Sequence, residues 1–196
     1  LTGCRYTPRY LELGFGGMQN EADGESTPTP LVLAAENPSL GQPALRLWGK
    51  IDRVDTDGAG NFIVYDYKSG NVPTKTEIIK GKCLQLPFYL LAVSRLFLPT
   101  GQPVGAAYYS LRETNRLRGI WRREALDFGV KIKGALAEEE WAEVLDNAVQ
   151  IAFGFYYGIL QGHFPFAPPE ECPRYCEFRP ICRQQIWGRE GNNNAE

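Results

Sequence analysis

The chain has little histidine, no long apolar run and no excess of positive charge. No hydrophobic stretch approaches the ~20 residues that a membrane-spanning helix needs, so we expect no membrane partner. The first residues show no basic segment followed by an apolar one, which argues against a secretory signal and favours a cytoplasmic protein. A formal net charge of −2 argues mildly against a passive DNA-coating protein, because such proteins are usually basic. Internal repeats and low-complexity tracts are also missing.

The composition is otherwise ordinary for a globular protein, with 43% hydrophobic and 22% charged residues. A chain of 196 residues can form one domain with a real core. Because it begins at Leu1 rather than Met, we expect it to be a C-terminal fragment of a longer protein. We place one domain over residues 1–187 and expect the polar tail, residues 188–196, to be disordered.

Hydrophobic periodicity predicts several strands and two long helices. Strands are expected over residues 9–15, 31–35, 44–54, 62–68 and 104–111. Helices are expected over residues 74–97, where Pro87 should cause a kink, and over residues 137–160. The buried face of the second helix is predicted to carry Trp141, Leu145, Ala148, Ala152, Phe155 and Ile159. Strands first, then a helix, a strand and a helix, indicate an α/β (α+β) fold in which helices flank a mixed central sheet.

The chemistry is concentrated in two motifs joined by a Gly- and Asp-rich turn. They read Gly49-Lys50-Ile51-Asp52-Arg53-Val54-Asp55 and Val64-Tyr65-Asp66-Tyr67-Lys68-Ser69-Gly70. Side chains alternate along a strand, so Asp66 and Lys68 point to the same face, and the hairpin can bring Asp52 close to them. Neighbouring buried carboxylates repel each other, and a divalent cation with oxygen ligands relieves that repulsion. Taken alone, Asp66-x-Lys68 favours a plainer interpretation, a surface hairpin with a salt bridge.

A third motif, Gln85-x-x-x-Tyr89, changes that balance. In this order and spacing, the three motifs resemble the RecB-like branch of the PD-(D/E)xK nuclease superfamily, which includes the nuclease domains of RecBCD- and AddAB-type helicase–nucleases. The segment from Pro8 to Gly16 is also similar to the strand that precedes the catalytic hairpin in AddB-type nucleases. The resemblance covers nearly the whole chain. It implies a restriction-endonuclease-like fold and a deoxyribonuclease that uses Mg²⁺ or Mn²⁺.

The resemblance also implies a role for each motif residue. Asp52 and Asp66 would be metal ligands, and the backbone carbonyl of Tyr67 would be a further ligand. Lys68 would be the catalytic lysine, which orients the attacking water or offsets charge that develops on the phosphate. A metal at this point would stabilise the transition state of phosphodiester cleavage.

Gln85 and Tyr89 are one helical turn apart and therefore share a face. In the family this pair faces the active site, and the alternative is an amphipathic helix edge. The family also supplies a His or Glu from an N-terminal helix as a metal ligand, and we find no such helix here. His163 is the only histidine and is interpreted as structural or surface-exposed. Glu12, on a predicted strand, is only a weak candidate for that ligand.

The five cysteines are odd in number, and three of them cluster near the C-terminus. Cys172, Cys176 and Cys182 resemble the C-terminal iron–sulfur motif of AddB-type nucleases, which implies a [4Fe–4S] cluster. Three residues separate Cys172 from Cys176, where the family pattern has two. Cys4 is a candidate fourth ligand; without one, zinc or an empty site is expected. Cys83 is predicted to lie in the helix of Gln85 as a small buried hydrophobic residue.

Basic residues gather in one stretch of a dozen residues, and they are Arg112, Arg116, Arg118, Arg122 and Arg123. They are interpreted either as a rim that contacts DNA phosphates or as a solvated face of a strand and loop.

Three functions remain open from the sequence. The first is a Mg²⁺- or Mn²⁺-dependent exonuclease that acts on single-stranded DNA supplied by a helicase, in DNA repair or recombination. The second is a nuclease-fold module that binds DNA or a partner and has lost cleavage. The third is a metal hydrolase that acts on another phosphate ester. The Gln85–Tyr89 pair and the arginine cluster favour DNA.

Overall fold

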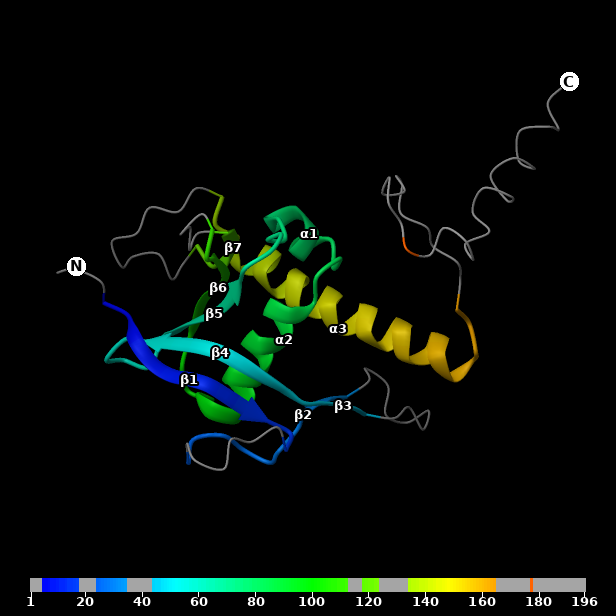
Figure 1. Cartoon of the computed structure of the whole chain (residues 1–196), viewed down its shortest axis with the longest axis horizontal. Helices are drawn as coiled ribbons and strands as arrows, with labels where there is room; N and C mark the ends of the chain where they lie inside the picture. The colour runs from blue at the N-terminus through cyan, green and yellow to red at the C-terminus, as the bar shows by residue number, and fades with distance from the viewer. Residues whose placement is uncertain are drawn as a thin grey trace, which may run out of the picture. The chain divides into compact units, whose positions relative to one another are not determined.

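The computed structural model describes residues 5–17, 24–34, 44–112, 118–123, 134–164 and 177 (Figure 1). The chain divides into two compact units, Leu1–Tyr156 and Tyr157–Glu196, and each is described by itself. In the described residues, no helix is both long enough and apolar enough to cross a membrane.

The first unit is built on a five-stranded mixed sheet with the strand order β1-β4-β5-β6-β7. Its strands are β1 (Thr7–Phe15), β4 (Gly49–Thr56), β5 (Phe62–Lys68), β6 (Pro103–Ser110) and β7 (Arg118–Trp121). Neighbouring strands are antiparallel except β5 and β6, which are parallel. The predicted mixed sheet flanked by helices is therefore confirmed, although β7 was not predicted.

The strand predicted over residues 44–54 is divided in two, which corrects the sequence analysis. β3 (Leu45–Leu47) pairs with β2 (Leu31–Leu33) in a separate two-stranded sheet, while β4 pairs with β1. Trp48 stands between the two strands with 65% of its surface exposed. The break arises because the two segments pair with different partners.

The turn between β4 and β5 is held by the side chain of Asp57. One of its oxygens accepts hydrogen bonds from the backbone N–H groups of Ala59 and Asn61, both at 2.9 Å. The other accepts a bond from the Asn61 amide at 2.8 Å and lies 3.1 Å from Arg5 Nε. Burial would raise the pKa of Asp57, but the hydrogen bonds from Asn61 and Ala59 outweigh it and lower the pKa.

The segment between β5 and β6 forms short helices instead of the single helix predicted over residues 74–97. They are α1 (Lys75–Ile79), α2 (Gln85–Ala92) and the π-helical turn η2 (Val93–Phe97). Gly81 ends the first piece in the left-handed region, with φ of 69°. Pro87 lies in the first turn of α2, where the missing N–H costs no helical hydrogen bond. The chain therefore breaks before the proline and is not kinked at it.

The long helix α3 (Glu138–Leu160) agrees with its predicted span, but part of its predicted buried face is wrong. Trp141 and Ala148 are buried as expected. Phe155 and Ile159 are 64% and 61% exposed, and Phe153 is buried instead. Leu145 and Ala152 are half-buried. Asn147 also contacts the rest of the first unit, because its amide donates to the Ile79 carbonyl at the end of α1. A 3.6-residue repeat identifies one face of a helix, but it does not tell how far along the helix other elements cover that face.

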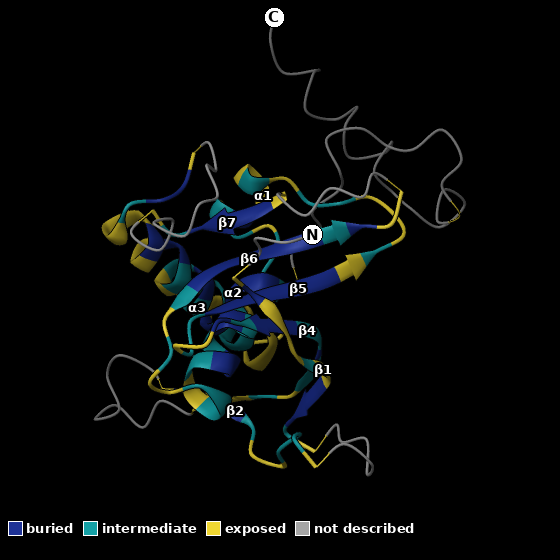
Figure 2. Ribbon diagram, turned by 90° about the vertical axis from the view of Figure 1, so that its left-hand side faces the viewer, coloured by how far each residue is buried: buried dark blue, intermediate teal, exposed yellow. Residues whose placement is uncertain are grey.

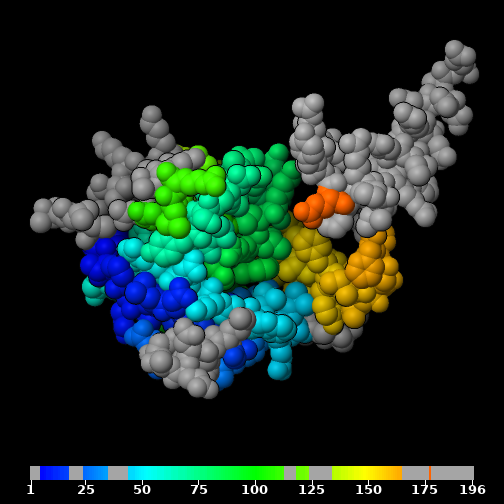
Figure 3. All heavy atoms as spheres, in the orientation of Figure 1, coloured from blue at the N-terminus to red at the C-terminus, as the bar shows by residue number. Residues whose placement is uncertain are grey.

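Most residues of β5 and β6 are buried (Figure 2), and because side chains alternate, they fill both faces of the sheet. One face packs against α2 and carries Val54, Val64, Ala106 and Ile120, all fully buried. A second cluster lies on the opposite face and includes Ile63, Tyr65, Ala107 and Trp121. The edge strand β1 lies at the surface beside β4 (Figure 3), and most of its first six residues are exposed. Both faces of β5 are therefore enclosed along most of its length.

The described part of the second unit is the end of α3 and its cap. Gly162 adopts a left-handed conformation with φ of 66°, and its N–H donates to the Ile159 carbonyl. The N–H of His163 donates to the Gly158 carbonyl at 2.8 Å. These two bonds form a Schellman cap, so the backbone of His163 helps to end the helix.

Candidate active site

Asp52 and Asp66 lie on the same face of the sheet, at the point where β4 and β5 stop pairing. The paired register of the two strands runs from Thr56↔Phe62 to Arg53↔Tyr65. The two residues of a pair point to the same face, and successive pairs alternate between the faces. Arg53 and Tyr65 point to one face, so the next residues along, Asp52 and Asp66, both point to the other. Asp52 Oδ2 accepts a hydrogen bond of 2.7 Å from the Tyr67 N–H. The aspartate side chain thus occupies the place of a ladder bond.

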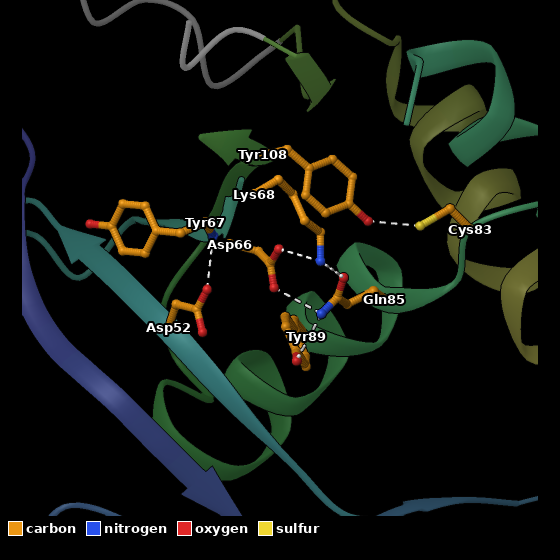
Figure 4. Close-up of polar contacts among 8 residues, drawn as sticks. All are labelled: Asp52, Asp66, Tyr67, Lys68, Cys83, Gln85, Tyr89 and Tyr108. Carbon is orange, nitrogen blue, oxygen red and sulfur yellow. Dashed lines mark hydrogen bonds and ion pairs between the residues drawn. The ribbon is translucent and has the colours of Figure 1, made fainter. Parts of the chain in front are cut away.

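A single amide, from Gln85 at the start of α2, connects the other predicted site residues (Figure 4). Its Nε2 donates to Asp66 Oδ1 at 2.8 Å and to the Tyr89 hydroxyl at 3.2 Å. Its Oε1 accepts from Lys68 Nζ at 2.9 Å. Only this orientation of the amide gives the lysine an acceptor and the carboxylate a donor. The i, i+4 pair predicted from the sequence therefore does face the two charged residues.

Asp66 is a buried carboxyl group, with 3% of its surface exposed. Burial raises the pKa of Asp66, Lys68 opposes that shift from 2.7 Å, and the charge of Asp52 adds to it. A buried carboxylate next to a second carboxylate is stabilised by any cation that approaches both. Lys68, whose side chain is 30% exposed, supplies part of that positive charge.

Tyr108 and Cys83 extend the cluster on its inner side and were not predicted as site residues. β6 pairs in parallel with β5 so that Tyr108 lies beside Asp66. The ammonium of Lys68 is 5.2 Å from the centre of the Tyr108 ring. The Tyr108 hydroxyl and Cys83 Sγ form a hydrogen bond of 2.7 Å. Burial, followed by the contact with Cys83, raises the pKa of Tyr108.

The prediction for Cys83 was wrong in two respects. The residue lies in the loop before α2 and not within the helix, and it is half-exposed rather than buried. The loop exists because the predicted helix breaks at Gly81. A periodicity analysis that runs through the break cannot place it.

The remaining candidate ligands do not complete this cluster. Glu12 lies on β1 opposite Asp52, since Leu11 and Leu13 pair with Arg53 and Ile51, but its carboxylate forms an ion pair of 2.5 Å with Lys50. His163 is exposed, in agreement with its interpretation as a surface residue. In the described ranges, no third Asp, Glu, His or Cys joins Asp52 and Asp66 in a group with metal-ligand geometry. The four predicted iron–sulfur ligands, Cys4, Cys172, Cys176 and Cys182, lie outside the described residues.

The predicted arginine cluster does not form one group, because Arg118 and Arg122 lie at opposite ends of β7. Arg118, at the start of β7, pairs with Tyr108 and so lies at the Asp66 end of the sheet, and Arg112 is exposed just after β6. Arg122 lies at the other end and donates to Glu138 and Gln102. Arg123 donates to the Ala135 carbonyl, also at that end. Arg116 falls outside the described residues.

The donor set fits a small divalent cation. Mg²⁺ typically takes one or two carboxylates, with the remaining positions filled by water and substrate oxygens. Asp52 and Asp66 provide two carboxylates on one face, and the peptide of Tyr67 lies against Asp52. None of the described residues donates a hydrogen bond to Asp52 Oδ1, so this oxygen is available to a cation. Burial raises the pKa of Asp66 and so disfavours its ionised form, which a cation beside it would favour.

Comparison with known proteins agrees with this geometry. The sequence model of the PD-(D/E)XK nuclease superfamily matches residues 3–183. No curated protein matches the chain. The superfamily match extends over most of the 196 residues and includes both acidic strands, Lys68 and α2. The mixed sheet with flanking helices is the restriction-endonuclease-like arrangement expected of such enzymes. The chain belongs to the PD-(D/E)XK nuclease superfamily.

Proposed function

We propose that the chain is a Mg²⁺- or Mn²⁺-dependent deoxyribonuclease whose centre is formed by Asp52, Asp66 and Lys68. The observation that carries the proposal is the convergence of these three side chains with Gln85 at the open end of the β4–β5 ladder. A salt bridge on a surface hairpin would not need a buried aspartate beside a second one.

Each residue of the cluster has its own role in this proposal. Asp52, Asp66 and the Tyr67 carbonyl would hold the divalent ion, which supplies charge stabilisation to the phosphodiester under attack. Lys68 holds its ammonium between Asp66 and Gln85, where it can orient water or neutralise a phosphate oxygen. Gln85 fixes the positions of Asp66 and Lys68 relative to each other. The Tyr89 hydroxyl accepts the second hydrogen bond from the amide nitrogen of Gln85.

The finer parts of the proposal come from the resemblance to RecB-like nucleases. They are exonuclease action on single strands, coupling to a helicase in DNA repair or recombination, a cytoplasmic location, and a [4Fe–4S] cluster on Cys4, Cys172, Cys176 and Cys182. Arg112 and Arg118 are the arginines best situated to contact DNA phosphates near the centre. A brown colour of the purified protein that bleaches in air would support the cluster.

The central test measures cleavage of end-labelled single-stranded DNA with Mg²⁺ or Mn²⁺. Wild type, Asp66→Asn and the matched control Asp146→Asn, an exposed aspartate on α3, are compared. We expect cleavage by wild type and the control, and none by Asp66→Asn or in the presence of EDTA. A circular single strand should resist an exonuclease. DNA binding without cleavage by all three proteins would instead identify a binding module.

A further inference from the structure

An ion pair between the half-buried Arg53 and the buried Asp55 lies behind the carboxylate cluster, on the opposite face of the sheet. Arg53 Nε donates to Asp55 Oδ1 at 2.5 Å, and Nη2 donates to Oδ2 at 2.6 Å. Asp55 is 3% exposed. The guanidinium also lies over the ring of Tyr65, 5.4 Å from its centre. The hydrogen bonds to Asp55 raise the pKa of Arg53 above its usual value, so the side chain stays charged.

Stability alone does not account for this pair. Desolvation of two charges costs about as much as their attraction returns, and apolar residues of similar volume often do equally well. A bidentate pair does, however, fix the guanidinium in one orientation, because both partners are planar. The pair therefore provides a rigid support on that face of β4 and β5.

The guanidinium of Arg53 also contacts Tyr67 on the next strand. Arg53 Nη1 donates to the Tyr67 hydroxyl at 3.4 Å. The Tyr67 ring also packs edge-on against Tyr109, with 5.5 Å between ring centres. Figure 4 shows this ring pointing away from Asp66, while the N–H of the same residue points to Asp52. The side chain of Tyr67 thus contacts Arg53 and Tyr109 on one face of the sheet, while its N–H bonds Asp52, whose side chain is on the other face.

Backbone pairing with β4 does not hold the Tyr67 peptide in place. The β4–β5 register ends at Arg53↔Tyr65, although β4 continues to pair with β1 and β5 with β6. The pairing of Tyr67 with Tyr109 holds the Tyr67 backbone on the β6 side. On the β4 side, the described polar contacts of Tyr67 are its N–H bond to Asp52 and the contact of its hydroxyl with Arg53.

We propose that Arg53 is a positioning residue that acts through Tyr67. It helps to hold the peptide whose N–H fixes Asp52 and whose carbonyl would be a ligand of the divalent ion. Asp55 serves to lock Arg53 in the required orientation. The role toward the ion rests on the proposed function, whereas the role toward the Tyr67 peptide does not.

The first test follows hydrogen exchange of the Tyr67 amide in the metal-free full chain by NMR. Arg53→Lys keeps the charge but loses the planar fork. Arg9→Lys is the control, because Arg9 on β1 also forms an ion pair with an acidic residue, Glu25, which lies outside the strands and is not part of the carboxylate cluster. We expect the Tyr67 amide to exchange roughly tenfold faster in Arg53→Lys and unchanged in Arg9→Lys.

The amide of Val64, in the buried part of β5, is the internal reference. A general loss of stability would speed both amides equally, and that result would overturn the proposal. Tyr67→Phe removes only the hydroxyl that Arg53 reaches and should give an effect in the same direction. An unchanged Tyr67 amide in both variants would also overturn it.

The second test measures the affinity for Mn²⁺ alone, from the electron paramagnetic resonance signal of the free ion. We expect the dissociation constant of Arg53→Lys to rise about tenfold, with no change in Arg9→Lys. Faster exchange at Tyr67 with unchanged Mn²⁺ affinity would refute the role toward the ion. Wild type that binds no Mn²⁺ would refute the proposed function, while the exchange result would still decide whether Arg53 positions Tyr67.

Discussion

Replacement of Gln85 by leucine should destabilise the protein even though a polar residue is exchanged for an apolar one. The amide of Gln85 donates to the buried Asp66 carboxylate and accepts from Lys68. Leucine is similar in size but can make neither bond. Asp66 would keep its contact with the lysine and lose its only neutral donor among the described residues.

The expected loss can be worked from these contacts. A hydrogen bond to a charged group contributes about 1.5–3 kcal/mol. Because Asp66 and Lys68 remain paired with each other, the lower value applies to each bond, which gives a total of about 3 kcal/mol. In a domain of this size that loss lowers the melting temperature by roughly 6–12 °C.

Urea unfolding in EDTA at neutral pH measures the effect without any contribution from metal. Tyr89→Phe is the matched control, since it removes only the hydroxyl that accepts the second amide hydrogen at 3.2 Å. It should cost about 0.5–1 kcal/mol. If Gln85→Leu lost less than the control, the amide would not be the bridge described above, and Asp66 would have to be satisfied by other groups.

Three further predictions follow from the described contacts. Asp57 has a lowered pKa, so its contribution to stability is present above its unfolded-state pKa and is lost as pH falls through the folded value. Asp57→Asn should therefore lose about 1–2 kcal/mol against wild type in urea unfolding at pH 7, and the gap should narrow as the pH falls below the unfolded-state pKa of about 3.9. Phe153→Ala should lower the free energy of unfolding by about 3–4 kcal/mol and Phe155→Ala by less than about 0.5 kcal/mol, because only Phe153 is buried. Equal losses of stability in thermal unfolding would contradict the corrected buried face of α3. Arg118→Ala should lower the slope of log affinity against log salt for single-stranded DNA by about 0.7, whereas Arg122→Ala, whose partner is Glu138, should leave it unchanged.

The parts of the site that the sequence predicts are those that depend on local geometry. The bounds of β5 agree with the prediction because an alternating apolar segment follows a strong turn. Alternation alone places Asp66 and Lys68 on one face, and the hairpin adds Asp52. Gln85 and Tyr89 are one turn apart, so their shared face survives even though the predicted helix does not.

Features that depend on contacts between distant segments were not predictable in the same way. Tyr108 lies beside Asp66 only because β6 pairs in parallel with β5, and no local pattern encodes that register. The break at Gly81 has a local signal, the glycine itself with Pro87 six residues further on, but apolar spacing on both sides of it concealed the signal. Arg53 and Asp55 had no predicted role, since the contact of Arg53 with Tyr67 joins two strands.

The arginine cluster shows why nearness in sequence is a poor measure of nearness in a sheet. Arg118 and Arg122 are four residues apart, and a strand rises about 3.3 Å per residue, so roughly 13 Å separates them. Charges at that distance, beyond one Debye length at physiological salt, act on different phosphates. The acidic first turn of α3 further engages Arg122 through Glu138. Arg118 and Arg112 are thus the described arginines at the Asp66 end of the sheet, whereas Arg122, after β7, contacts the first turn of α3.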